Sequence, residues 1–285
     1  MSGTRWILGA AALATAAAAP FVVRGAGAAT ASQETLPAGA GEAVARLDAS
    51  PRHGEWATIR VPNGDTLRAW VVHPERDGPA PVVIVIHEIY GLSHWVRAVA
   101  DQLAADGFLA IAPDLLTMKG VPADSLGEPE RQAATAAIRT LERPLVNQYL
   151  SAVASWGMAQ PSAADSYGVV GFCWGGASSF AHAVAAPEVD AAVVYYGGSP
   201  DPSSLGSVQA PVLGLYGGDD ARVNATVPPA DSAMQALGKS FEAHFFEGAG
   251  HGFLRAQDGR EGANLEASRR AWPLTVGFFR EHLGG

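Results

Sequence analysis

The sequence predicts an α/β domain over residues 54–285, with an open, mostly parallel sheet of about eight strands and helices on both faces. Three observations predict this fold class. Short apolar runs alternate with stretches of helical period. The later runs are apolar throughout, which is typical of parallel strands covered on both faces. Finally, 48% hydrophobic residues in a chain of 285 are enough for one large core.

Each expected element follows from local patterns of residues. Two strands flank the turn signal Asn63-Gly64-Asp65, which predicts an antiparallel hairpin at one edge of the sheet. The expected strands are 56–61, 67–73, 82–87, 109–112, 168–171, 191–196, 212–216 and 241–246. The expected helices are 93–106, 130–156, 175–186, 230–238 and 264–282. Residues 115–129 show no clear period, so we expect a loop beside the functional site.

The first 31 residues have the layout of a secretory signal peptide. Arg5 precedes an uncharged, alanine-rich stretch over residues 6–23, and Arg24 and small-x-small sites at 26–28 and 29–31 follow it. A retained membrane helix is the alternative, but weakly hydrophobic alanines and Pro20 favour cleavage. We therefore expect export to the periplasm or the medium, with no stable membrane insertion after cleavage. Residues 32–53 are aperiodic and are expected to be a linker.

Composition and motifs exclude several functions. The formal net charge of -9 and the lack of a lysine and arginine cluster argue against nucleic acid as a partner. His87-Glu88 is not followed by the second histidine of HExxH, and the sequence has no GxGxxG or Walker loop. We therefore expect no metal and no cofactor. Separately, we expect a small molecule as the partner and a monomeric chain.

The strongest motif surrounds Cys173, the single cysteine of the chain. An apolar strand runs through Gly171 and Cys173 to Gly175 and then into a helix, which is the nucleophile-elbow pattern with cysteine in place of serine. The glycines leave room for a sharp reversal, and the helix N-terminus is expected to lower the thiol pKa. The alternative is an ordinary buried cysteine that packs as a small apolar side chain.

Two further motifs could complete a catalytic triad. One apolar strand ends at Asp219-Asp220, and another is followed by a glycine-rich loop that carries His251. Acidic groups at the carboxyl ends of parallel strands can orient an imidazole that acts as a base. The chain order of cysteine, acid and histidine matches that of hydrolases with such an elbow. Asp219, or a simple turn role for the aspartates, remains the alternative at this point.

The loop after the third strand, His87 to Gly91, supplies the remaining candidates. The corresponding loop of such hydrolases donates one oxyanion N–H, so we assign the backbone N–H groups of Ile89 and Trp174 to an oxyanion hole. Glu88 is unusual there, because a carboxylate beside a thiol opposes thiolate formation unless it moves or takes the proton. A loop salt bridge is the alternative for Glu88. Tyr90 is assigned to substrate binding.

Taken together, these motifs resemble the dienelactone hydrolase family. The resemblance spans about residues 54–283 and rests on HEIYG, APDL, GFCWGG, GGDD and AGHGFLR. It implies an α/β-hydrolase fold with a triad of Cys173, Asp220 and His251. It also implies that Glu88 helps to activate the thiol when an anionic substrate arrives, and that Arg255 binds a substrate carboxylate. The family's second carboxylate-binding arginine aligns with Ala133, although Arg131 is near.

The function expected from these residues is hydrolysis of an ester or lactone through a cysteine acyl-enzyme. The expected substrate is small and carboxylated or polar, with Arg255 as its anchor. Two alternatives stay open: a broad carboxylesterase or thioesterase, and a non-catalytic binding protein on the same fold.

Overall fold

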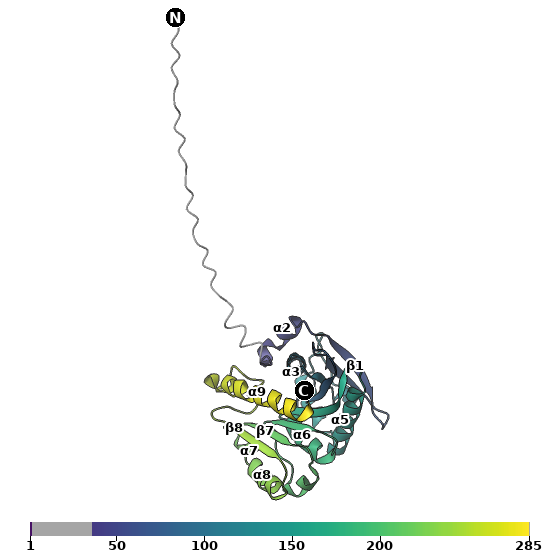
Figure 1. The fold of residues 1–285 in the computed structure, drawn as a ribbon, viewed down its shortest axis with the longest axis vertical. Coiled ribbons are helices and arrows are strands. Elements are labelled where there is room, and N and C mark those ends of the chain that lie inside the picture. The colour runs from purple at the N-terminus through teal and green to yellow at the C-terminus, as the bar shows by residue number, and fades with distance from the viewer. Residues whose placement is uncertain (2–35, 285) are drawn as a thin grey trace.

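The computed structural model describes residue 1 and residues 36–284 of the chain (Figure 1). The predicted leader, apart from Met1, and positions 32–35 lie outside the described residues. Within residues 36–284, none of the helices combines the length and the apolar character that crossing a bilayer requires.

The described residues form one eight-stranded sheet, as the sequence predicts. Its strand order is β1-β2-β4-β3-β5-β6-β7-β8, in which β1 and β2 pair antiparallel, β2 pairs antiparallel with β4, and all other pairs are parallel. The bounds are β1 Gly54–Arg60, β2 Thr66–Val72, β3 Ala80–Ile86, β4 Leu109–Pro113, β5 Ala163–Phe172, β6 Ala191–Tyr195, β7 Val212–Gly217 and β8 Phe241–Phe246. The expected hairpin lies at one edge, and β8 lies at the other.

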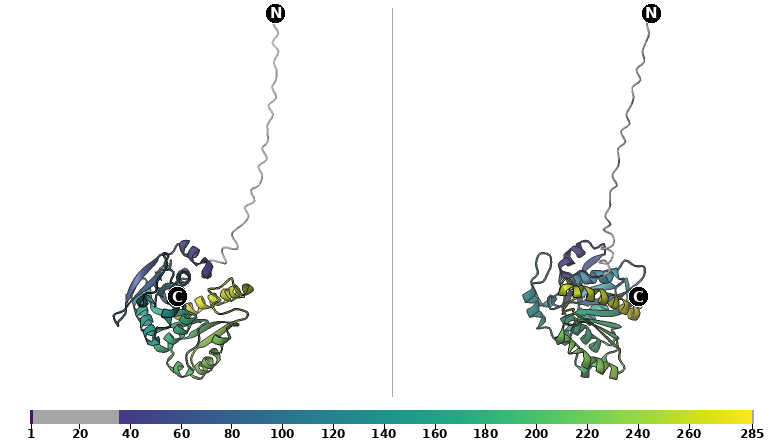
Figure 2. Two further views of the ribbon diagram at one scale, coloured as in Figure 1. Left: turned by 180° about the vertical axis from the view of Figure 1, so that it is seen from behind. Right: turned by 90° about the vertical axis from the view of Figure 1, so that its left-hand side faces the viewer.

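Helices cover both faces of the sheet (Figures 1 and 2). Residues of α2, α3 and α9 pack on one face, and residues of α5, α6 and α8 pack on the other. The helix bounds are α2 Ala43–Asp48, α3 His94–Ala105, α4 Arg131–Ile138, α5 Arg143–Met158, α6 Trp174–Ala185, α7 Ala221–Asn224, α8 Val227–Ala236 and α9 Ala263–Leu283. This is the layered α/β architecture that the alternation of strands and helices predicts.

Alternate residues of each central strand enter opposite core layers. In β3, Val83 and Val85 belong to the core layer on the α3 side of the sheet, whereas Val82 and Ile84 belong to the layer on the α5 side. All seven residues of the strand are buried. An uninterrupted apolar run is therefore what a strand needs when helices cover both of its faces.

The prediction of one helix over residues 130–156 was wrong, because two helices occupy this range. Glu130 accepts hydrogen bonds from the backbone N–H groups of Gln132 and Ala133 and so caps the start of α4. The chain then turns at Thr140, and Pro144 lies in the first turn of α5. Proline is favourable there but breaks a helix interior, because it lacks an N–H donor and its ring clashes with the preceding turn.

The prediction of an aperiodic linker was wrong for residues 36–53. This segment contains the short helix α2, and Leu36 and Ala43 are buried in the same core layer as α3. The backbone N–H of Ala40 also donates to the carbonyl of Arg255 at 2.8 Å. The domain therefore begins before residue 54, and a helix of six residues is too short to show a period.

Candidate active site

Cys173 lies at the reversal between β5 and α6. Its backbone has φ 56° and ψ −113°, a conformation that is costly for a residue with a side chain. A Cβ on Gly171 would lie 1.9 Å from the carbonyl oxygen of Gly175, so the reversal leaves no room for one. The backbone N–H of Cys173 donates to the carbonyl of Tyr195 at 3.0 Å, which fixes the bend to β6. The sharp elbow expected from the sequence is therefore present.

Gly175 brings the end of β3 against the elbow. A Cβ at this position would lie 2.4 Å from the carbonyl oxygens of both Ile86 and His87. Only glycine therefore permits this approach, which carries the loop with Glu88 toward the thiol. The second glycine of the motif thus serves packing between two loops of the site.

Asp220 and His251 meet at the carboxyl ends of β7 and β8. The imidazole Nδ1 lies 2.5 Å from Oδ2 of Asp220, a carboxylate that is only 8% exposed. Asp219 points elsewhere and pairs with Arg260 at 2.7 Å on the surface. Of the two aspartates, Asp220 therefore orients the imidazole, and its acceptor oxygen favours the proton on Nδ1.

The thiol of Cys173 is half-buried, while the ring of His251 remains partly accessible. Within residues 36–284, no hydrogen bond joins this thiol to the imidazole. The backbone N–H of Trp174 donates to the sulfur instead, and the Glu88 carboxylate acts on it electrostatically. The structure therefore brings the aspartate and the histidine into contact and leaves the sulfur engaged with other groups.

Burial, followed by the charge of Glu88, raises the pKa of Cys173 to about 11. The N–H of Trp174 and the charge of Arg222 lower this pKa but do not outweigh the first two causes. The expectation that the helix N-terminus lowers the thiol pKa was therefore wrong for the net effect. The thiol is protonated at neutral pH in this arrangement.

Glu88 is almost fully buried and forms an ion pair with Arg255. Its Oε2 lies 2.9 Å from Nε of the guanidinium. Burial raises the pKa of Glu88 to about 7, although the charges of Arg255 and Arg131 lower it. The carboxyl therefore changes protonation near neutral pH, which is the property that a general acid or base requires.

Two arginines converge on Tyr90. The guanidinium of Arg131 lies 3.9 Å from the ring centroid, and that of Arg255 lies 5.5 Å from it. Both contacts are of the cation–π type. Arg131 begins α4, so the site has a second cation even though the sequence resemblance aligns Ala133 with the family's second arginine.

His87 fixes the Glu88 loop to the loop after β4. Its Nε2 accepts the backbone N–H of Leu115 at 3.2 Å, so Nδ1 carries the proton and donates to the carbonyl of Glu88 at 2.7 Å. Burial lowers the pKa of His87, consistent with this neutral form. The ring also stacks on Trp174 with 5.9 Å between centroids. The start of the predicted loop 115–129 therefore contacts the candidate site.

The two assigned oxyanion donors come from separate segments, the start of α6 and the loop after β3. Trp174 is the first residue of α6, where backbone N–H groups lack intrahelical acceptors. Ile89 follows Glu88, and its backbone N–H donates no hydrogen bond to any of the described residues. Both groups therefore occupy the chain positions where oxyanion donors of an elbow hydrolase are expected, after the nucleophile and in the loop after β3.

Tyr196 was missed by the sequence analysis, which placed it at the end of a strand. It has a positive φ of 39°, and its ring packs edge-on against His251 at 5.2 Å. Its hydroxyl is buried without a hydrogen-bond partner among the described residues. Burial, followed by the charges of Glu88 and Cys173, raises its pKa well above the usual value. A tyrosine at the end of an apolar strand is a common pattern, so the sequence gives no signal that Tyr196 lies in the site. Its positive φ, which is seen only in the structure, sets it apart from an ordinary strand residue.

Comparison with known proteins places the chain in a family. The family model described as "Dienelactone hydrolase family" matches residues 67–283. A Salmonella typhimurium protein named "Putative carboxymethylenebutenolidase" is 33% identical over 233 residues, which cover 78% of this chain and 85% of that protein. The Pseudomonas putida protein named "Carboxymethylenebutenolidase" is 31% identical over 207 residues, with 70% and 86% covered.

A solved structure supports the same assignment. The structure titled as a putative dienelactone hydrolase from Klebsiella pneumoniae superposes with a TM-score of 0.69 at 29% identity, covering 80% of this chain and 99% of that one. The family match includes β3 to β8 in full, β2 without its first residue, and the whole candidate site from Glu88 to Arg255. This chain therefore belongs to the dienelactone hydrolase family and is a hydrolase with the α/β-hydrolase fold.

Proposed function

We propose that this hydrolase cleaves an ester or lactone bond of a small carboxylated substrate, with Cys173 as its nucleophile. The observation that carries the proposal is the arrangement around the thiol. Cys173 lies at a strained elbow, Asp220 orients His251, and a buried carboxyl that is paired with an arginine acts on the sulfur. This combination suits a thiol that is neutral at rest and ionises when substrate binds.

The ion pair between Glu88 and Arg255 gives a physical route for activation. A substrate carboxylate that binds Arg255 competes with Glu88 for the same guanidinium. The released carboxyl, with its pKa raised to about 7 by burial, can accept the thiol proton. Arg131, which stacks on Tyr90, adds positive charge beside this position. The pair of arginines favours an anionic substrate over a neutral ester.

The proposed reaction has two covalent steps. The thiolate of Cys173 attacks the carbonyl carbon, and the N–H groups of Ile89 and Trp174 stabilise the oxyanion. The C–O bond then breaks, and the alkoxide leaves with the proton that Glu88 took from the thiol, passed on directly or through His251. Water that loses a proton to His251 next attacks the thioester, which releases the carboxylic acid and regenerates the thiol.

Substitution of the cysteine tests the proposal directly. Hydrolysis of a panel of carboxylated lactones and aryl esters is compared between the wild type, Cys173→Ala and Cys173→Ser. We expect Cys173→Ala to lose turnover and Cys173→Ser to be poor, because a hydroxyl has a higher pKa than a thiol. A trapped thioester at Cys173, seen by mass spectrometry of the acid-quenched wild type, would support the acyl-enzyme. Unchanged turnover in Cys173→Ala would refute the role of the thiol.

We also propose that the chain is exported and acts as a monomer. The support for export is the order of Arg5, the alanine-rich stretch and the small-x-small sites in the sequence. Cell fractionation followed by N-terminal sequencing of the recovered protein tests export, and sedimentation tests the monomer. A full-length protein in the cytosolic fraction would contradict export.

A further inference from the structure

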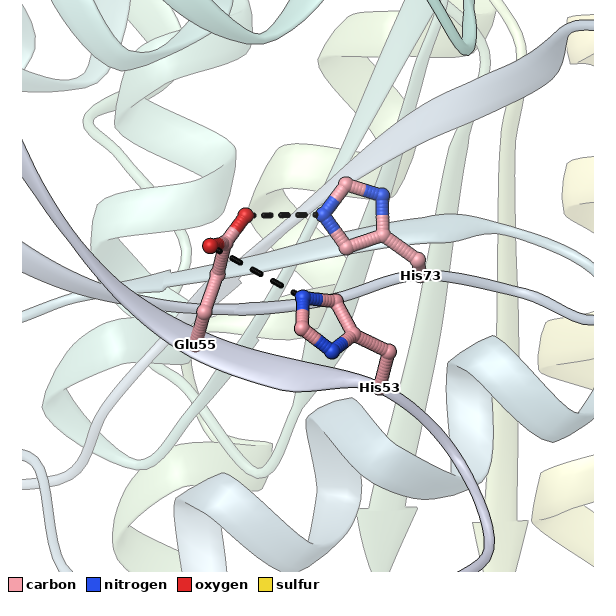
Figure 3. Close-up of side chains that lie close together, drawn as sticks. All are labelled: His53, Glu55 and His73. Carbon is pink, nitrogen blue, oxygen red and sulfur yellow. Dashed lines mark hydrogen bonds and ion pairs between the residues drawn. The ribbon is translucent and has the colours of Figure 1, made fainter.

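Three metal-ligating side chains gather at the open end of the β1–β2 hairpin (Figure 3). They are His53, just before β1, Glu55 in β1, and His73, just after β2. The donor atoms of the three side chains lie within 4.8 Å of one another. We propose that they bind a divalent transition-metal ion of the zinc type.

Strand pairing explains how residues far apart in the sequence meet. The register pairs Gly54 with Val72, and the backbone N–H of His73 donates to the carbonyl of His53 at 3.0 Å, so the two histidines lie opposite each other. His53 and Glu55 are two residues apart along the same strand direction and therefore project from one face. The three side chains consequently share one face of the hairpin.

The geometry is close to that of a metal site. Nε2 of His73 lies 3.2 Å from Oε1 of Glu55, and Nε2 of His53 lies 3.7 Å from Oε2. Ligands of a tetrahedral zinc ion at about 2.0–2.1 Å are roughly 3.3 Å apart. His53 is exposed, so its ring can rotate to close the remaining gap. Small side-chain movements, with no change of backbone, would complete the coordination.

The donor set matches zinc chemistry. Two imidazole nitrogens and one carboxylate oxygen form the His₂Glu set found in some zinc enzymes, in which water takes the fourth position. Copper(II) and nickel(II) prefer imidazole ligands as well, whereas calcium and magnesium prefer oxygen ligands only. An exposed ion pair between a histidine and a glutamate contributes little stability by itself. Two imidazoles directed at one carboxylate thus suit a metal better than a surface ion pair.

The cluster is separate from the candidate active site. Val72 at the end of β2 pairs with Ala110 near the start of β4, so the hairpin end lies at the amino-terminal edge of the parallel strands. Cys173, Asp220 and His251 follow the carboxyl ends of strands, at the opposite edge. A metal bound here therefore crosslinks the edge hairpin without taking part in ester hydrolysis.

Zinc titration of the full chain tests the site. All variants carry Cys173→Ala, so that the thiol cannot act as a competing ligand. Binding is measured at about pH 7.5, by competition with a chromophoric chelator, and melting temperature is measured with and without excess zinc. We expect one zinc ion per chain and at least about tenfold weaker binding in each of His53→Ala, Glu55→Gln and His73→Ala. At a hundredfold excess over the dissociation constant, zinc should raise the melting temperature by about 5–10 °C.

His244→Ala is the matched control. His244 lies 2.6 Å from Glu242, two residues away on β8, but this pair has no third ligand among the described residues. Its substitution should leave zinc affinity unchanged. Far-UV circular dichroism of the surface variants checks that each one is folded, and Glu55→Gln keeps the side-chain shape. Absence of zinc binding, or equal affinity in the wild-type cluster and its three variants, would overturn the proposal.

Discussion

The charge of Glu88 should control the reactivity of Cys173, which Glu88→Gln can test. Burial and then Glu88 raise the thiol pKa to about 11, compared with an ordinary value of 9.0. At pH 8 the wild-type thiolate fraction is therefore about a hundredfold below that of an ordinary thiol. Removal of the carboxylate charge leaves the larger cause, burial, in place. We expect Glu88→Gln to alkylate about three to ten times faster at pH 8, and still more slowly than a free thiol.

Iodoacetamide labelling measures this effect without interference, because the chain has one cysteine. The second-order rate constant is measured by mass spectrometry from pH 7 to pH 10. Glu266→Gln removes the same charge from an exposed position on α9 and should match the wild type. The melting temperature of each variant is also measured, because a destabilised variant could be labelled faster simply by unfolding more often. A rate in Glu88→Gln equal to or below that of the wild type would refute the electrostatic argument.

Four further outcomes follow from the geometry. Burial raises the pKa of Glu88 from 4.5 to about 7 in the folded state, so its contribution to the free energy of unfolding is present at low pH and is lost as pH rises through about 7. Urea melts at several pH values should therefore show a smaller fall in this free energy with pH in Glu88→Gln than in the wild type. Asp220→Asn should lower kcat by about 10³–10⁴-fold, because the amide no longer stabilises the imidazolium of His251. Steady-state kinetics with an activated ester test this, and a loss of kcat below tenfold would contradict it. Gly171→Ala should prevent folding or lower the free energy of unfolding by several kcal/mol, since a Cβ would lie 1.9 Å from a backbone oxygen. An unchanged urea midpoint would show that the elbow can accommodate a Cβ at this position. Arg255→Ala should raise KM for carboxylated esters far more than for neutral ones of the same size, and an equal effect on both would remove its role as a carboxylate anchor.

The sequence by itself was sufficient to predict the architecture, and it indicated the loops that carry the candidate site residues. Apolar runs without alternation can be buried only between two helical layers, and the observed β3 follows this rule. The spacing of glycines around Cys173 likewise predicts an elbow, because steric exclusion in a sharp turn depends on local residues alone. Strand-end motifs predicted that Asp220 and His251 lie near each other, because the carboxyl ends of parallel strands meet at one edge of a sheet.

Tertiary structure decided the features that depend on contacts between distant segments. It separated Asp219 from Asp220, because one faces Arg260 on the surface and the other faces His251. It also reversed the expected shift of the Cys173 pKa, since burial depends on everything packed around the thiol. Electrostatic and hydrogen-bond partners are set by distances in the folded chain, so the spacing of motifs along the sequence does not predict ion pairs or pKa shifts.

The hairpin cluster shows the same division. His53 and Glu55 have a spacing that is visible in the sequence, but it is not a familiar metal-ligand motif, and no metal is expected from the sequence. His73 joins them only through the register of β1 with β2. Register is fixed by which faces of the strands are buried, and this is a property of the folded sheet. The sequence thus determined the fold and the candidate site residues, and the tertiary structure decided which groups contact them and how their pKa values shift.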